Sequence, residues 1–118
     1  MKIKSKVWLE EGKELIFGKG KSDLLKAIDE TGSISKASEK MGISFRHGWG
    51  YVTAIEKRLG TKLIERSKGG KDGGGSRLTA RARELISKFD ILDNEISGFS
   101  DTKFKEIFLD GNRSAEDR

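Results

Sequence analysis

The chain has 118 residues, no cysteine and a net charge of +5, with 36% of its residues charged. This length allows one domain with one modest core, and the lack of cysteine excludes disulfide bonds and thiolate metal sites. No apolar run approaches the roughly 20 residues of a membrane span, and the N-terminus lacks the continuous apolar core of a signal peptide. We therefore expect a cytoplasmic protein that does not bind a membrane.

The charge is unevenly distributed along the chain. Residues 1–88 hold 20 lysines and arginines against 11 acidic residues, whereas residues 89–118 hold 4 against 8. A basic body followed by an acidic tail suits a polyanionic partner for the body alone. Charge by itself does not distinguish a nucleic-acid binder from a soluble basic protein.

The N-terminal residues are predicted to form a β-hairpin. Apolar residues alternate with lysines over residues 2–9, as in a half-buried strand, and residues 15–17 are the returning strand. A turn over residues 10–13 joins them. The glycines at positions 18 and 20 then break the strand. They lack the third glycine of a dinucleotide-binding motif, so no cofactor is expected.

Three helices are predicted next, over residues 21–31, 34–41 and 45–59. Gly32 ends the first helix, and Ser33 and Ser44 are suitable N-caps for the second and third. Gly42 supplies the turn between them, where a positive φ is usually needed. The last two helices therefore read as a helix-turn-helix.

The third helix has two distinct faces at about 100° per residue. Its buried face is expected to hold Phe45, Gly48, Val52, Ile55 and Leu59. Its outward face is expected to hold Arg46, His47, Gly50, Thr53, Ala54 and Lys57. Trp49 lies at the edge and is expected to pack beneath the helix. The two glycines are expected to allow close approach, Gly48 to the core and Gly50 to DNA.

We expect the outward face of this helix to enter the major groove of DNA. Arg46 matches the two acceptors of guanine, and His47 lies beside it in the first helical turn. Ser44 can donate to a phosphate at the helix N-terminus, and Gly50 and Thr53 complete the groove face. The alternative is that these are solvated or capping side chains.

Residues 63–66 and 76–78 are predicted as short strands around a glycine-rich loop, the wing, over residues 67–75. Its cations can bind phosphates along a minor groove or the sugar-phosphate backbone. The cations concerned are Arg66, Lys68, Lys71 and Arg77. A flexible linker is the alternative. A Walker-type phosphate loop is disfavoured, because aspartate rather than Ser or Thr follows Lys71.

A long helix is predicted from its N-cap, Thr79, with further helical turns over residues 101–110. Apolar residues recur at alternating spacings of four and three from Leu78 to Phe99, which is a heptad seam. The seam is about 30 Å long, too long for one small domain to cover, which favours a homodimer over packing on its own domain. The expected interface residues are Leu85, Phe89, Leu92, Ile96 and Phe99. Such a dimer suits a palindromic DNA site.

Together these elements predict an α+β, mainly α fold: a winged helix-turn-helix with an N-terminal β-hairpin and a long C-terminal dimerisation helix. We expect residues 1–79 to be the DNA-binding domain, 80–110 the dimerisation region and 111–118 a disordered tail. With one histidine and no metal-ligand spacing, the chain is not expected to be an enzyme. The predicted function is sequence-specific DNA binding by a transcriptional regulator. The alternative is a winged-helix module that binds another protein.

Three segments carry a family resemblance. They read LIFGKGKSDLLKAIDETGSIS (15–35), GISFR (42–46) with Trp49, and GGKDGGGSRLT (69–79). They resemble the N-terminal DNA-binding domain of the ModE-type, molybdate-responsive regulators. A looser resemblance to LysR-type DNA-binding domains runs through the helix pair, Leu59-Gly60 and the step from Leu63 to Arg66. Both families imply a regulator that reads DNA with the third helix and dimerises through the helix after the wing.

ModE-type regulators usually carry C-terminal oxyanion-binding domains, for which this chain has no counterpart. The resemblance alone suggests a link to molybdate or tungstate uptake genes, and an oxyanion effector is not expected to bind within the chain. A small-oxyanion sensor using the glycine loop is the competing interpretation. Gly48 and Gly50 also replace bulkier residues that the family leads one to expect in the recognition helix.

Overall fold

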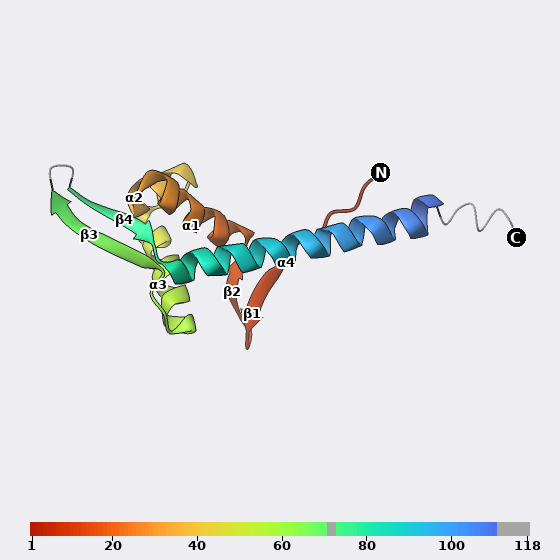
Figure 1. The fold of residues 1–118 in the computed structure, drawn as a ribbon, viewed down its shortest axis with the longest axis horizontal. Helices are drawn as coiled ribbons and strands as arrows, with labels where there is room; N and C mark the ends of the chain where they lie inside the picture. The colour runs from red at the N-terminus through yellow and green to blue at the C-terminus, as the bar shows by residue number, and fades with distance from the viewer. Residues whose placement is uncertain (71–72, 111–118) are drawn as a thin grey trace, which may run out of the picture. The chain divides into compact units, whose positions relative to one another are not determined.

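The computed structural model describes residues 1–70 and 73–110 (Figure 1). The chain divides into two compact units, one formed by Trp8–Phe89 and the other by Met1–Val7 together with the chain from Asp90 onward. The two observed hairpins and the three α-helices before the last one lie in the Trp8–Phe89 unit.

The N-terminal hairpin pairs two antiparallel strands, β1 (Trp8–Glu11) and β2 (Glu14–Gly18). Gly12 supplies the positive φ of 65° that its turn needs. The prediction of a strand from residue 2 is wrong over residues 2–7. Trp8 already pairs with Gly18, the last residue of β2, so the returning strand ends before it could pair with earlier residues.

Three helices follow, α1 (Lys19–Thr31), α2 (Ile34–Lys40) and α3 (Phe45–Leu59). The predicted caps of α2 and α3 are confirmed. The Ser33 hydroxyl accepts a hydrogen bond from the Lys36 N–H, and the Ser44 hydroxyl accepts one from the His47 N–H, both at 3.1 Å. Gly42 joins the two helices with a φ of +73°. The helix-turn-helix is therefore formed as predicted.

Helix α1 begins at Lys19, two residues before its predicted start. Gly18 occupies the N-cap position in an extended conformation, without a side-chain hydrogen bond, and the helix takes in Gly20. The elements that contact α1 include α2, β2 and α3. The apolar face of α1, which consists of Leu24, Leu25 and Ile28, is almost fully buried. Burying each of these side chains contributes about 1.5–3 kcal/mol, which outweighs the poor helix propensity of one glycine.

The wing is a second antiparallel hairpin, formed by β3 (Ile64–Gly70) and β4 (Gly73–Leu78). The prediction of a loop over residues 67–75 is wrong for most of its length, because the strands pair from Ile64 opposite Leu78 to Gly70 opposite Gly73. Ladder hydrogen bonds use only the backbone, so glycine does not prevent them. Residues 71–72 lie outside the described residues.

Hydrogen bonds from backbone N–H groups attach the wing to the helices. The Glu56 carboxylate of α3 accepts from the N–H groups of Leu63 at 2.8 Å and Ile64 at 3.3 Å. On the other strand, the Ser76 N–H donates to the Gly32 carbonyl at 2.8 Å, at the end of α1. Hydrogen bonds to a carboxylate are stronger than neutral ones. Together these bonds fix the base of the wing beside the helix-turn-helix.

The last helix, α4 (Ala80–Phe104), continues into a π-helical segment, η1 (Lys105–Asp110). Thr79 caps it as predicted, because its hydroxyl accepts from the Ala82 N–H at 3.1 Å. The helical turns predicted over residues 101–110 are confirmed. The tail predicted to be disordered, residues 111–118, lies outside the described residues.

Phe89 is part of the core of the Trp8–Phe89 unit. Its side chain is only 3% exposed, and its ring meets that of Phe17 edge-on with centroids 5.2 Å apart. Phe17 is itself fully buried. The expectation that Phe89 faces a second copy is therefore corrected, because its ring is already covered within the chain.

The other expected interface residues keep accessible surface. Leu85 is half-buried, whereas Leu92, Ile96 and Phe99 are exposed along α4. Their role in a dimer stays a prediction. The compact unit extends to Phe89, ten residues beyond the expected end of the DNA-binding domain at residue 79, because the start of α4 buries Ala82 and Phe89 in the same core.

Candidate nucleic-acid interface

The outward face of α3 is exposed to solvent. Arg46, His47 and Gly50 are exposed, and Thr53 is half-buried with its hydroxyl donating to the Gly50 carbonyl at 3.1 Å. Lys57 extends the same face toward the end of the helix. The structure therefore brings these predicted site residues together on one accessible side of α3. Their binding of DNA stays a prediction.

Helix α3 contributes no acidic side chain to its outward face. Glu56 is the one acidic residue of the helix, and its carboxylate is turned to the base of the wing. Arg58 pairs with Glu14 of β2. The remaining cations, Arg46 and Lys57, are exposed. A face with cations and no competing carboxylate favours a polyanion.

Ser44 performs its capping role at the start of α3. Besides accepting from the His47 N–H, its hydroxyl lies 2.9 Å from His47 Nδ1. This second contact holds the imidazole near the helix N-terminus, where the helix dipole favours an anion. Contact between Ser44 and a phosphate stays a prediction.

The buried side of α3 is shorter than predicted. Gly48, Val52 and Ile55 are buried, but Phe45 and Leu59 are exposed. The buried positions span only the middle of the helix, so its first and last residues lie beyond the packed segment. The expectation that Phe45 and Leu59 belong to the core is therefore wrong.

Trp49 does not pack beneath the helix, contrary to the prediction, and is 38% exposed. Arg66 of β3 places its guanidinium 4.4 Å from the Trp49 ring centroid, and Phe45 stacks on Trp49 with centroids 6.5 Å apart and 7° between the planes. Exposed cation–π contacts contribute about 0.5–1 kcal/mol. Arg66 therefore joins the wing to α3, whereas its contact with DNA stays a prediction.

A second stack flanks the other side of the first turn. The His47 and Tyr51 rings lie 6.4 Å apart between centroids, and the Lys21 Nζ lies 5.1 Å from the Tyr51 centroid. Partial burial lowers the pKa of the Lys21 ammonium below its ordinary value. The sequence prediction omitted Lys21 and Tyr51. The available signal was the four-residue spacing of two aromatic pairs in α3, which places each pair on one side of the helix.

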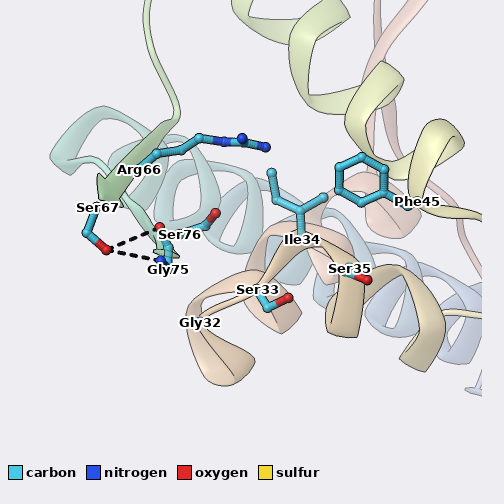
Figure 2. Close-up of a pocket in the computed structure, with 9 residues that line it drawn as sticks. All are labelled: Gly32, Ser33, Ile34, Ser35, Phe45, Arg66, Ser67, Gly75 and Ser76. Atoms are coloured by element: carbon cyan, nitrogen blue, oxygen red, sulfur yellow. Dashed lines mark hydrogen bonds between the residues drawn. The ribbon is translucent and has the colours of Figure 1, made fainter. Parts of the chain in front are cut away.

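A cleft of about 250 Å³ separates the wing from the helix-turn-helix (Figure 2). The Arg66 side chain reaches from β3 across this cleft toward Ile34 and Phe45, which form its apolar end. The polar lining comes from Gly32, Ser33, Ser35, Ser67, Gly75 and Ser76. Ser67 is held in place because its hydroxyl accepts from the Gly75 N–H at 3.1 Å.

The structure places two of the other three predicted wing residues, Lys68 and Arg77, on the strands of the wing. Arg77 is exposed on β4, with Glu65 opposite it in the ladder. Lys68 belongs to β3 by its backbone. Lys71 lies outside the described residues. The wing therefore places Arg66 and Arg77 on neighbouring strands of one hairpin.

The bacterial regulatory helix-turn-helix pattern of the lysR family matches residues 22–83, which is just over half of the chain. The match runs from α1 through the wing to the first turn of α4. The chain belongs to this family. The LysR-type resemblance and the winged helix-turn-helix fold class are thereby confirmed.

Individual relatives extend this result. The transcriptional regulator ModE of Haemophilus influenzae is 39% identical over 70 residues, which cover 59% of this lysR-family chain and 28% of ModE. The molybdenum-pterin-binding protein MopB of Rhodobacter capsulatus is 33% identical over 87 residues, 74% of this chain and 32% of MopB. The structure of the CbnR DNA-binding domain in complex with DNA has a TM-score of 0.52 and 25% identity, covering 83% of this chain and 95% of that domain.

This lysR-family chain therefore spans about a third or less of the length of the two sequence relatives. The resemblance to ModE-type regulators is confirmed for the matched segment. Within residues 1–70 and 73–110, no helix has both the length and the apolar character to cross a bilayer. The same residues contain no cluster of three or more His, Cys, Asp or Glu side chains that could hold a metal ion.

Gly48 and Gly50, the two glycines of α3, are predicted to respond oppositely to replacement by alanine. A Cβ on Gly48 would lie 2.0 Å from the Ser38 hydroxyl oxygen and 3.2 Å from the Ser38 Cβ, whereas a Cβ on Gly50 would meet nothing within 4 Å. Overpacking costs about 1–3 kcal/mol, and removing a helical glycine gains up to about 1 kcal/mol. In urea denaturation, Gly48→Ala should lower the free energy of unfolding by up to about 2 kcal/mol, and Gly50→Ala should raise it by up to about 1 kcal/mol.

The Gly48 prediction has an internal control. The Ser38 hydroxyl is buried without a hydrogen-bond partner, so removing it leaves no other group unsatisfied. Adding Ser38→Ala to Gly48→Ala should recover part of the lost stability, because the shorter of the two contacts disappears. A Gly48→Ala protein as stable as Gly50→Ala would contradict the close approach of α2 and α3.

Proposed function

We propose that this chain is a sequence-specific duplex-DNA-binding transcriptional regulator that acts as a homodimer. The observation that carries the proposal is the exposed, acid-free face of α3, which presents Arg46, His47, Gly50 and Thr53. Membership of the lysR family and similarity to the CbnR domain that binds DNA support it. Selection of bound sequences from a random duplex pool tests it. One motif should be enriched, and the absence of any enriched motif would overturn the proposal.

Arg46→Ala is expected to weaken binding to the selected duplex by about 1–3 kcal/mol, or roughly 5- to 150-fold, because Arg46 would lose two hydrogen bonds to a guanine. The loss should be greatest for sites with guanine at one position. A gel-shift titration measures it. Arg81→Ala is the matched control, since Arg81 is also an exposed arginine but lies on α4. Equal affinities of the Arg46→Ala and unchanged proteins would contradict the groove role of α3.

Arg77→Ala is expected to weaken binding to all duplexes alike, because a wing cation would neutralise one phosphate. The slope of log affinity against log salt should fall by about 0.9. Lys68 and Lys71 are proposed to act in the same way. Lys13→Ala, in the turn of the N-terminal hairpin, is the control and should leave the slope unchanged. A loss confined to one sequence would instead indicate that Arg77 reads a base.

The homodimer is proposed to form along α4. Leu92, Ile96 and Phe99 are exposed at spacings of four and three residues, which places them on one side of the helix. Two copies paired there would present two α3 helices, so the DNA site is proposed to be roughly palindromic. The spacing of half-sites in the selected motif tests this directly.

A link to molybdate or tungstate uptake genes is proposed from similarity to the matched part of ModE and MopB. The regulator is proposed to act in the cytoplasm, where bacterial DNA is accessible. An oxyanion effector bound by this chain is not part of the proposal. Calorimetry with molybdate, tungstate and sulfate checks this point, because heat from any of them would show an effector site within the chain.

A further inference from the structure

Phe45 is the first residue of α3, and its ring is 48% exposed although it is a large apolar side chain. It shares the first turn with Arg46 and His47, which are also exposed. The N-terminal residues of a recognition helix are those that reach base edges in the major groove. Phe45 therefore lies where a DNA base would meet an apolar surface.

The exposed ring is held in one orientation by its neighbours. One face stacks on Trp49 at 6.5 Å with the planes 7° apart, and Trp49 is in turn covered by the Arg66 guanidinium at 4.4 Å. Figure 2 shows that Phe45 also lies beside Ile34 at the apolar end of the cleft. A side chain that is already ordered loses little conformational entropy on binding. The ring is thus prepared to contact a partner without being buried in its own chain.

We propose that Phe45 is a specificity-determining residue that contacts the 5-methyl group of a thymine in the major groove, an inference that rests on the proposed DNA binding. Thymine presents a methyl group on its groove edge, and apolar side chains such as phenylalanine pack against it. The cations beside the ring, Arg46 and Arg66, suit DNA better than an apolar protein partner. Trp49 and Arg66 are positioning residues, because they hold the ring without touching the methyl group.

Deoxyuridine tests the proposal, because it differs from thymine only by lacking this methyl group. The probe is the duplex selected from the random pool, with each thymine replaced by deoxyuridine one position at a time. At one thymine in each half-site, the replacement should weaken binding of the unchanged protein about fourfold, the effect of exposing one methyl-sized group. Phe45→Ala should bind the thymine and deoxyuridine duplexes equally at that position.

Matched variants separate contact from positioning. Leu59→Ala, which shortens an exposed apolar side chain at the other end of α3, should keep the fourfold preference for thymine. Trp49→Ala should lose the preference, and Trp49→Phe should restore it, because a phenyl ring can still stack on Phe45. Thermal melting of each variant shows whether the fold is intact. The preference of the unchanged protein for thymine over deoxyuridine is measured without any substitution in the protein, so the stability of the variants does not affect it.

The outcomes distinguish this inference from the proposed function. Indifference to deoxyuridine at every position, or a preference that survives in Phe45→Ala, would overturn the role of Phe45 while leaving DNA binding in place. A selected motif without thymine would do the same. If no duplex is enriched, both the role of Phe45 and the proposed function are overturned.

Discussion

Replacing Phe89 with alanine is expected to lower the free energy of unfolding by about 3–5 kcal/mol. The ring is 3% exposed and packs edge-on against the buried ring of Phe17, so its removal leaves a cavity in the core. A single domain is usually stable by about 5–15 kcal/mol, which makes this loss a large share of the total. Urea denaturation at an unchanged m-value measures it.

Phe99→Ala is the matched control, because Phe99 is the same residue type on the same helix but is 65% exposed. The stability of a dimer depends on protein concentration, whereas packing within one chain does not. The loss caused by Phe89→Ala should therefore be the same at every concentration, and any loss caused by Phe99→Ala should vary with it. A Phe89→Ala loss that shrinks on dilution would show that Phe89 belongs to the interface after all.

The parts of this fold that can be predicted from the sequence are those that depend on interactions between residues close together in the chain. The sequence predicts Ser33 and Ser44 as caps because serine is favoured at that position, and each accepts a hydrogen bond from the N–H three residues later. The sequence also predicts the turn at Gly42, because such a turn usually needs a positive φ, which glycine adopts without strain and which Gly42 has in the structure. The outward positions of Arg46 and His47 also follow, since helical periodicity alone fixes the angle of a side chain around the axis.

The parts that cannot be predicted from the sequence depend on contacts between elements that are distant in the chain. Periodicity gives the direction of Trp49 but not the presence of Arg66, which arrives from β3 to stack on it. It cannot show Lys21 either, which reaches the Tyr51 ring from α1. The heptad pattern likewise places Phe89 on an apolar stripe without showing that Phe17 covers it. In each case, the missing information is which tertiary neighbour covers a side chain.

Replacing Ile96 with glutamate is expected to dissociate the proposed homodimer and to weaken binding of the palindromic duplex by about 10²–10⁴-fold, the usual gain from linking two binding modules. Ile96 is exposed between Leu92 and Phe99 on one side of α4. A two-fold interface would repeat the substitution, so two carboxylates would enter one apolar seam. Analytical ultracentrifugation measures the dissociation, and gel-shift titration measures the affinity.

Ile91→Glu is the control for this charge change. Ile91 is another exposed isoleucine of α4, but it lies about 100° from Leu92 around the helix and so outside the proposed seam. Both variants change the net charge of the chain by the same amount, so any general repulsion of DNA affects them equally. They should bind a single half-site equally well, because each retains an intact α3. If they also bind two half-sites equally, the apolar stripe does not join two copies, and the α3 face must account for the whole affinity.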